Sequence, residues 1–188
     1  YGVSATPLQL AQAYAAIANG GKLHQPAFIE GSNNPPISAI DPEIADAVAA
    51  MLETVPTAQG TGSRARVANY RIAGKTGTSH KSGASGYAAA RYVSSFAGFG
   101  PASNPRLVCI VVINDPSGKE YYGGLVAAPL FSQVMTGAMR ILNIPPDDYQ
   151  TMLVNAVDSG DVSDDVSDDV SGDISGDISD DVSGVAED

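Results

Sequence analysis

The chain has 188 residues and a formal net charge of −11 at pH 7. Twelve of its twenty-one carboxylates lie between residues 158 and 188, where there is no lysine or arginine, so the rest of the chain is close to neutral. This near-neutral body gives no electrostatic reason to expect binding to nucleic acid or to a membrane surface. The single cysteine, Cys109, excludes an intrachain disulfide and a cysteine-rich metal site.

Two helices are expected in the first third of the chain. The first begins at Thr6-Pro7-Leu8-Gln9, where Thr6 and Gln9 can form a capping box and Pro7 suits the first helical position. Asn19-Gly20-Gly21 ends it, and a Pro- and Asn-rich loop follows up to Pro36. Asp41 then caps a second helix, which Pro56 closes. Its apolar face comprises Ile44, Ala47, Val48, Met51, Leu52 and Val55.

Three consecutive strands are expected next, at about 70–79, 92–99 and 107–114, after an exposed, flexible loop at 57–63. Seven apolar residues in a row predict that the third strand is covered on both faces, with Cys109 as a small buried hydrophobe. A third helix is expected near 126–142, with Pro129 in its first turn. The sequence therefore predicts an α/β (α+β layered) fold in which helices flank an antiparallel sheet. Three strands and three helices make a small core, so further partners are expected from elsewhere.

The C-terminal stretch, 149–188, is expected to be an acidic, low-complexity tail separate from the domain at 1–148. From Val162 it repeats valine or isoleucine, serine and acidic residues with a four-residue period. Its carboxylates repel one another and it has no aromatic residue beyond Tyr149, so we expect disorder. Calcium binding is the alternative, but neither an EF-hand loop nor a Gly-rich nonapeptide repeat is present.

The Lys75-Thr76-Gly77 triplet is the candidate site, because serine acyl-transfer enzymes that recognise penicillin carry it on a strand. Side chains alternate along a strand, so Lys75 and Gly77 share one face and Thr76 and Thr78 the other, unless a twist re-aims them. Lys75 can attract a substrate carboxylate and the threonine hydroxyls can bind it. Gly77 allows close approach of a neighbour, and the backbone N–H of Thr78 can serve as an oxyanion donor.

The chain resembles the transpeptidase domain of class B penicillin-binding proteins, most closely the division-specific, septal members. The resemblance runs from Tyr1 to about Asp148, and it rests on five pieces that occur in order: Ser4–Ala11, Ala18–Gly21, Ala73–Thr78, Phe96–Ala102, and Val111–Pro116 leading to Tyr122-Gly123-Gly124. It implies a serine-type peptidoglycan D,D-transpeptidase that needs no cofactor or metal. Its substrates are stem peptides ending in D-Ala-D-Ala, which β-lactams mimic.

The same resemblance assigns site residues and surroundings. Lys75, Thr76, Gly77 and Thr78 match the family's third active-site motif, and Tyr92, Tyr121 and Tyr122 resemble aromatic residues that line its substrate cleft. The implied location is the inner membrane, with the catalytic domain on the periplasmic side and other cell-division proteins as partners. The chain contains no apolar stretch of membrane-spanning length, so an anchor is expected upstream.

The sequence departs from the family at the nucleophile. No serine begins a Ser-x-x-Lys tetrad, so the nucleophile and the true second motif are expected upstream of Tyr1, and this chain alone is expected to be inactive. Ser32-Asn33-Asn34 fits the second motif by letters, but it is expected to be a coincidence because it follows the first helix. His24 and His80 could be combined with Asp41 or Glu53 in a triad, yet nothing in their spacing supports one.

Two alternatives remain open from the residues. A D,D-carboxypeptidase or a β-lactamase-like hydrolase also carries the Lys-Thr-Gly triplet, and it would release product without forming a cross-link. A non-catalytic interaction module of a division complex would also account for the missing nucleophile.

Overall fold

The first helix begins at the capping signal expected from the sequence. In the computed structural model, which describes residues 4–29, 34–83 and 86–149, α1 spans Pro7–Ala18. The Gln9 N–H donates to Thr6 Oγ1 at 3.2 Å, and the Thr6 N–H donates to Gln9 Oε1 at 2.9 Å, so the predicted capping box is confirmed. Gly20 and Gly21 follow with φ of 60° and 82°, which turns the chain away from the helix axis.

A short strand pair connects the first two helices where only a loop was expected. β1 (Lys22–Leu23) pairs antiparallel with β2 (Ile37–Ser38), and two-residue strands are too short to leave a pattern in the sequence. The second helix, α2 (Pro42–Glu53), begins as expected because Asp41 Oδ1 accepts a hydrogen bond from the Glu43 N–H at 3.0 Å.

The three predicted strands form one antiparallel sheet in the order β3-β4-β5. They are β3 (Ala73–Gly83), β4 (Gly86–Gly100) and β5 (Leu107–Asn114). The first strand starts three residues later than expected, because Asn69, at a φ of 67°, turns the chain and Val67 bridges Tyr70. The first two strands also run further than expected, beyond the end of β5.

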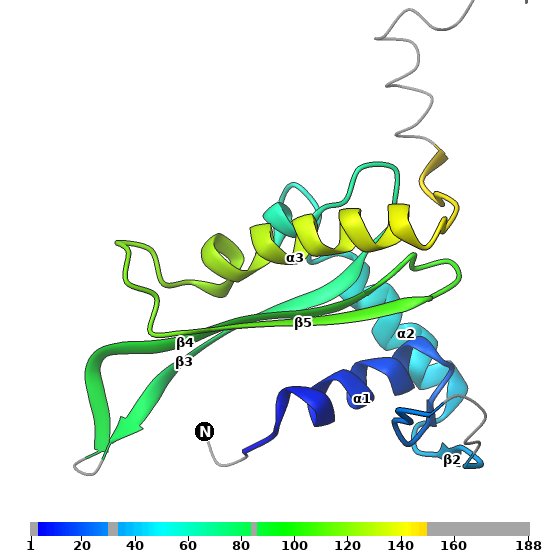
Figure 1. Ribbon diagram of the computed structural model, residues 1–188, viewed down its shortest axis with the longest axis horizontal. Helices are drawn as coiled ribbons and strands as arrows, with labels where there is room; N and C mark the ends of the chain where they lie inside the picture. Colours follow the sequence, from blue (N-terminus) through cyan, green and yellow to red (C-terminus); the bar gives the residue numbers. More distant parts are fainter. Residues whose placement is uncertain (1–3, 30–33, 84–85, 150–188) are drawn as a thin grey trace, which may run out of the picture. The chain divides into compact units, whose positions relative to one another are not determined.

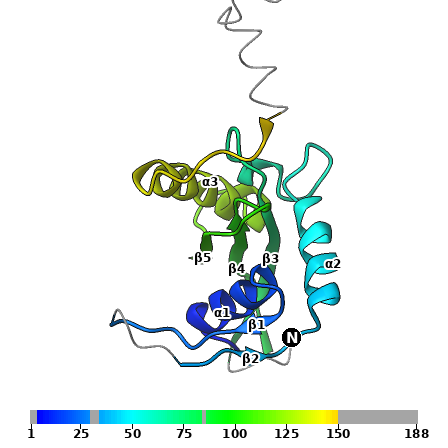
Figure 2. The ribbon, with the colours of Figure 1, turned by 90° about the vertical axis from the view of Figure 1, so that its right-hand side faces the viewer.

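The sheet lies between helices, so the predicted layered fold is confirmed (Figure 1). The third helix, α3 (Gly123–Ile141), covers one face of the sheet and α1 covers the other, while α2 lies beside β3 (Figure 2). α3 begins three residues before the expected start, so Pro129 lies inside the helix and the prediction that it occupies the first turn was wrong.

The main core lies between α3 and the sheet. Phe96 of β4 and Phe131 of α3 are fully buried, with ring centroids 4.7 Å apart. Met135 and Met139 extend the same buried stripe along the helix. The segment at 57–63 joins this core instead of forming a wholly exposed loop, because Gly62 is buried and an added Cβ there would lie 2.7 Å from Phe96 Cε2.

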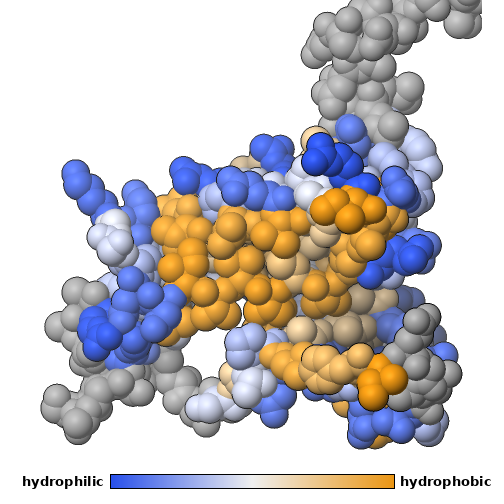
Figure 3. Space-filling model, in the orientation of Figure 1, coloured by the Kyte–Doolittle hydropathy of each residue, from blue (hydrophilic) through white to orange (hydrophobic). Residues whose placement is uncertain are grey.

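The prediction that the third strand is covered on both faces is confirmed only in part: α3 and α1 both contact β5, but most of its residues are half-buried and not buried. β5 is an edge strand among the described residues, Val112 is 45% exposed, and Cys109 is half-buried instead of buried. Next to it on α3, Leu130 and Val134 are 44% and 47% exposed. Apolar side chains accordingly gather over α3 and β5 on one face of the molecule (Figure 3). The apolar face of α2 is also partly open, with Ile44 and Met51 largely exposed.

Of the predicted acidic tail at 149–188, only Tyr149 belongs to the described residues, so the disorder of the tail stays a prediction.

Within 4–29, 34–83 and 86–149, none of the helices is both long and apolar enough to cross a membrane.

Candidate functional site

Lys75 and Thr76 form the exposed polar end of the candidate site on β3. The Lys75 side chain folds back along the strand, and its Nζ donates to both the backbone oxygen and Oγ1 of Thr76, each at 3.2 Å. Thr76 Oγ1 also lies 3.2 Å from Thr61 Oγ1. The lysine is therefore drawn to the side of the strand that carries the threonines, as the sequence analysis allowed if a twist re-aims the side chains. This arrangement places an ammonium group beside two hydroxyls.

Gly77 lies between two close neighbours. It pairs with Ser95 of β4, and a Cβ added at Gly77 would collide with Ser95 Oγ. From the helix side, a Cβ added at Gly123 would collide with the backbone oxygens of Gly77 and Ser95. The expectation that Gly77 permits close approach is confirmed, and a matching glycine at the start of α3 makes the contact possible.

Thr78 joins the strand to the N-terminus of α3. Its Oγ1 accepts a hydrogen bond from the Gly123 N–H at 2.9 Å. Tyr122, the N-cap residue, makes no side-chain capping bond of its own, so Thr78 supplies the cap from another element. Because its oxygen accepts from the helix, the Thr78 hydroxyl can donate its proton to a bound oxygen.

A pocket of about 350 Å³ opens at this junction. Its walls come from β3, from the start of α3 and from the loop that holds Thr61, and its lining residues are Thr61, Thr76, Thr78, Tyr122, Gly123, Gly124 and Leu125. Hydroxyl groups and the positive end of a helix dipole together favour an anionic or carbonyl oxygen.

The three tyrosines named from the sequence come together in one stack. Tyr92 and Tyr121 are stacked, with centroids 4.0 Å apart and ring planes 12° from parallel. Tyr121 and Tyr122 are 4.4 Å apart, and their hydroxyls are joined by a hydrogen bond of 3.1 Å. The ring of His80 adds to the other end, 4.6 Å from Tyr92. Since Tyr122 also lines the pocket, the stack leads from the outer part of the β3–β4 hairpin to the threonines.

Two polar contacts that support the stack were not recognised from the sequence. Ser94 is fully buried, and its hydroxyl donates to the backbone oxygen of Tyr121. Asp115 binds Lys81 and Arg91, whose hydrogen bonds lower the pKa of its carboxyl from 3.8 to about 2. Both depend on contacts between segments about 24 to 34 residues apart, which local sequence patterns do not reveal.

The other candidate residues do not join this site. Asp41 caps α2, Glu53 binds Arg71 at 2.8 Å, and His24 is exposed. Ser32 and Asn33 lie outside the described residues. Across the described part of the chain, no three histidine, cysteine or acidic side chains gather in a way that could hold a metal ion.

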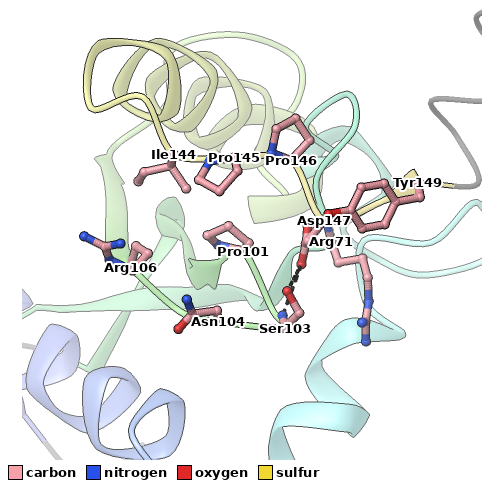
Figure 4. A pocket seen from close by; sticks show the side chains of 10 residues that line it. All are labelled: Arg71, Pro101, Ser103, Asn104, Arg106, Ile144, Pro145, Pro146, Asp147 and Tyr149. Atoms are coloured by element: carbon pink, nitrogen blue, oxygen red, sulfur yellow. Dashed lines mark hydrogen bonds between the residues drawn. The ribbon is translucent and has the colours of Figure 1, made fainter.

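A separate pocket of about 420 Å³ lies where the segment at 101–106 meets the chain that follows α3 (Figure 4). Asp147 organises this region by accepting hydrogen bonds from the Arg71 N–H and the Ser103 hydroxyl, at 2.7 and 2.8 Å. The Arg71 side chain points away from the pocket toward α2, where it binds Glu53. The wall of this pocket is rich in proline, and the carboxylate of Asp147 is already bonded within the protein, so we interpret the pocket as a structural junction between segments.

Comparison with known proteins identifies the class to which this fold and site belong. A family model described as the penicillin binding protein transpeptidase domain matches residues 1–136. The chain therefore belongs to the family of penicillin-binding protein transpeptidase domains, as the sequence analysis expected.

Individual relatives agree with this assignment. The chain is 44% identical over 151 residues to a probable peptidoglycan D,D-transpeptidase PbpC of Pseudomonas aeruginosa, a match that covers 80% of this chain and 27% of the relative. It is also 44% identical over 153 residues to the peptidoglycan D,D-transpeptidase FtsI of Escherichia coli K12, covering 80% of this chain and 26% of the relative. The chain thus spans about a quarter of the length of these curated relatives.

A solved structure carries the same fold. The apo structure of the TP domain from Burkholderia pseudomallei penicillin-binding protein 3 superposes with a TM-score of 0.70 at 40% sequence identity. The match covers 78% of this chain and 45% of the solved chain. More than half of that solved chain therefore has no counterpart in the match.

Proposed function

We propose that this chain is part of a serine-type peptidoglycan D,D-transpeptidase that cross-links stem peptides during septal cell-wall synthesis. The observation that carries the proposal is the junction of the Lys75–Thr78 strand with the N-terminus of α3. There an ammonium group, threonine hydroxyls and a helix N-terminus surround one pocket. Such a cluster of donors suits the binding of a terminal carboxylate and the stabilisation of a developing oxyanion.

The chemistry follows from this donor set. A serine oxygen attacks the carbonyl carbon of the penultimate D-Ala, the bond to the terminal D-Ala breaks, and the leaving amine takes a proton. An amine on a neighbouring stem then attacks the acyl-enzyme ester, which forms the cross-link and returns the serine. Lys75 and the hydroxyls of Thr76 and Thr78 bind the substrate carboxylate. The Thr78 N–H donates a hydrogen bond to the oxyanion that forms on the attacked carbonyl. β-Lactams acylate the same serine as the C–N bond of their four-membered ring breaks, and the freed amine stays tethered to the acyl group, so no leaving group departs and the acyl-enzyme persists.

The attacking serine is proposed to come from another part of the transpeptidase domain, because no serine of this chain begins a Ser-x-x-Lys tetrad. The apolar surface over β5 and α3 supports this proposal (Figure 3). β5 has no lysine, proline or bulge of the kind that protects natural edge strands, so it is suited to pairing with a further strand. Without the other part, the chain is proposed to be inactive.

The tyrosine stack is proposed to line the substrate cleft. Its aromatic faces offer apolar contact to the body of a stem peptide or to the side chain of a β-lactam. The same proposal places the domain on the outer side of the inner membrane, where the substrate lies, with other cell-division proteins as partners and an anchor outside the described residues.

A hybrid protein tests the proposed function. Residues 1–148 of this chain replace the matching region of Escherichia coli FtsI, and the hybrid is incubated with a fluorescent penicillin. We expect covalent labelling of the folded hybrid and none of the 188-residue chain alone. Labelling of the chain alone, or a folded hybrid that stays unlabelled, contradicts the proposal.

Product analysis separates the proposed reaction from hydrolysis. With a stem-peptide donor and an amine acceptor, a transpeptidase forms a cross-linked dimer, whereas a D,D-carboxypeptidase or β-lactamase-like enzyme forms only the shortened peptide or the opened lactam. A hybrid that folds but forms no product at all supports the alternative that this chain is a non-catalytic interaction module.

A further inference from the structure

Asp115 occupies a special position directly after β5. It belongs to the Asn114-Asp115-Pro116 piece of the sequence, for which the proposed chemistry has no role. Its φ is 53°, a left-handed conformation that aspartate and asparagine adopt more readily than most residues. Asp115 therefore turns the chain at the end of the strand.

The carboxylate of Asp115 joins all three strands of the sheet. Lys81 of β3 donates to Oδ2 at 2.7 Å, and Arg91 of β4 donates through Nε to Oδ1 at 3.2 Å and through its NH2 group to Oδ2. Asp115 thus forms two ion pairs, one with Lys81 and one with Arg91. We name the group Lys81, Arg91 and Asp115 the carboxylate clamp.

The clamp lies where the three-stranded sheet becomes a two-stranded hairpin. The last pair between β4 and β5 is Val93 with Asn114, whereas β3 and β4 continue to pair beyond it, from His80 and Tyr92 outward. The pairing register shifts between His80 and Ser82, at the same level. A two-stranded ribbon is only marginally stable by itself, so its base is where a cross-link between strands has the most effect.

The clamp also contacts the tyrosine stack through the backbone. The Asp115 N–H donates to the backbone oxygen of Tyr92 at 2.9 Å. In sequence, Lys81 follows His80 and Arg91 precedes Tyr92, and the rings of His80 and Tyr92 are in contact. Tyr92 in turn stacks on Tyr121, so a shift at the clamp is transmitted to the stack.

We propose that Asp115 is a positioning residue for the substrate cleft: by binding Lys81, Arg91 and the backbone of Tyr92, it holds the tyrosine stack beside the Lys75–Thr78 strand. The proposal rests on the proposed function for its role in substrate binding. The position of the stack itself depends only on contacts within this chain. Asp115 touches neither the reacting atoms nor the pocket, so it acts through Tyr92.

The test compares Asp115→Asn with Asp46→Asn. Asparagine keeps the backbone N–H and tolerates the left-handed φ, so the first variant leaves the backbone as it is while it removes the charge and replaces one acceptor oxygen with an NH2 group. The control removes an exposed carboxylate from α2, away from the stack. In the 188-residue chain we expect faster hydrogen–deuterium exchange at 79–81 and 91–95 for Asp115→Asn, and unchanged exchange for the control.

The hybrid protein supplies the functional readout. For Asp115→Asn we expect the second-order rate constant of penicillin acylation to fall about fivefold, entirely through weaker binding, while the acylation rate at saturating penicillin is retained. A merely structural role would instead reduce the active fraction and leave the binding constant of the remaining protein unchanged. The Asp46→Asn hybrid should match the unmodified hybrid.

Three results would overturn the proposal: unchanged exchange at 79–81 and 91–95, unchanged penicillin binding, or an equal effect of the control. If the unmodified hybrid folds and is not acylated, the proposed function fails. The exchange experiment on the 188-residue chain still decides whether Asp115 holds the stack.

Discussion

The hydroxyl of Thr78 accepts a hydrogen bond of 2.9 Å from the backbone N–H of Gly123, although the two residues lie 45 positions apart in the chain. This bond caps α3 and fixes the helix N-terminus beside the strand that carries Lys75. It is possible only because Gly123 has no side chain, since a Cβ there would collide with the backbone of β3 and β4. The helix end and the strand are therefore built as one unit.

Alanine at Gly123 should be clearly destabilising, whereas alanine at Gly137 of the same helix should not. A Cβ at Gly123 would collide with the backbone oxygens of Gly77 and Ser95, and we expect a loss of about 1–3 kcal/mol in the free energy of unfolding. At Gly137 a Cβ meets nothing within 4 Å, so the better helix propensity of alanine should add about 0.5–1 kcal/mol. Urea denaturation measures both, and equal effects would contradict the close contact.

Valine at Thr78 should impair the site more than serine. Valine keeps the shape but removes the acceptor for Gly123, which should cost about 0.5–1.5 kcal/mol of stability. It also removes the hydroxyl proposed to bind substrate, so penicillin acylation of the hybrid should fall about tenfold or more. Thr78→Ser keeps both functions and serves as the control. Similar acylation rates for the two variants would exclude the hydroxyl from the reaction.

How far the sequence alone predicts this fold depends on how local each signal is. The start of α1 was predicted correctly because Thr6 and Gln9 cap the helix within four residues. The start of α3 was placed three residues late because its cap comes from Thr78, on another element. The burial of the third strand was overestimated because the run from Leu107 to Ile113 gives composition but not the number of neighbouring strands.

In the candidate site, too, the residues could be named from the local sequence, whereas the contacts between distant segments could not be predicted. The Lys75–Thr78 strand was identified from its own letters together with the resemblance, and the structure places Thr76 and Thr78 on the wall of one pocket. The tyrosines were named separately, and their stacking could not be predicted because Tyr92 and Tyr121 belong to different segments. The role of Asp115 was missed for the same reason.

The pH dependence of the carboxylate clamp follows from the lowered pKa of Asp115. Hydrogen bonds from Arg91 and Lys81 lower this pKa from 3.8 to about 2. A lowered pKa means that the ionised carboxylate is favoured in the folded state, so its contribution to stability is complete above pH 3.8 and is lost as the pH falls toward 2. Carbon-detected NMR titration of the Asp115 carboxyl measures this directly. A midpoint near 3.8 would contradict the ion pairs.

Cys109 should react slowly with alkylating reagents in the folded chain. Its side chain is half-buried against the core, and burial raises the pKa of its thiol. At pH 8 we expect iodoacetamide to modify the folded chain at least about tenfold more slowly than the chain in urea. Because there is one cysteine, the modified fraction reports β5 alone. Equal rates in both states would show that this strand is not packed as described.

Penicillin labelling is the most direct test of the proposed transpeptidase function. The hybrid of residues 1–148 with the remainder of Escherichia coli FtsI, the same hybrid with Lys75→Ala, and the 188-residue chain are incubated with a fluorescent penicillin, with folding checked by circular dichroism. We expect labelling of the hybrid, strongly reduced labelling of the Lys75→Ala hybrid, and no labelling of the 188-residue chain. A folded hybrid without labelling, or labelling that does not depend on Lys75, would contradict the proposed function.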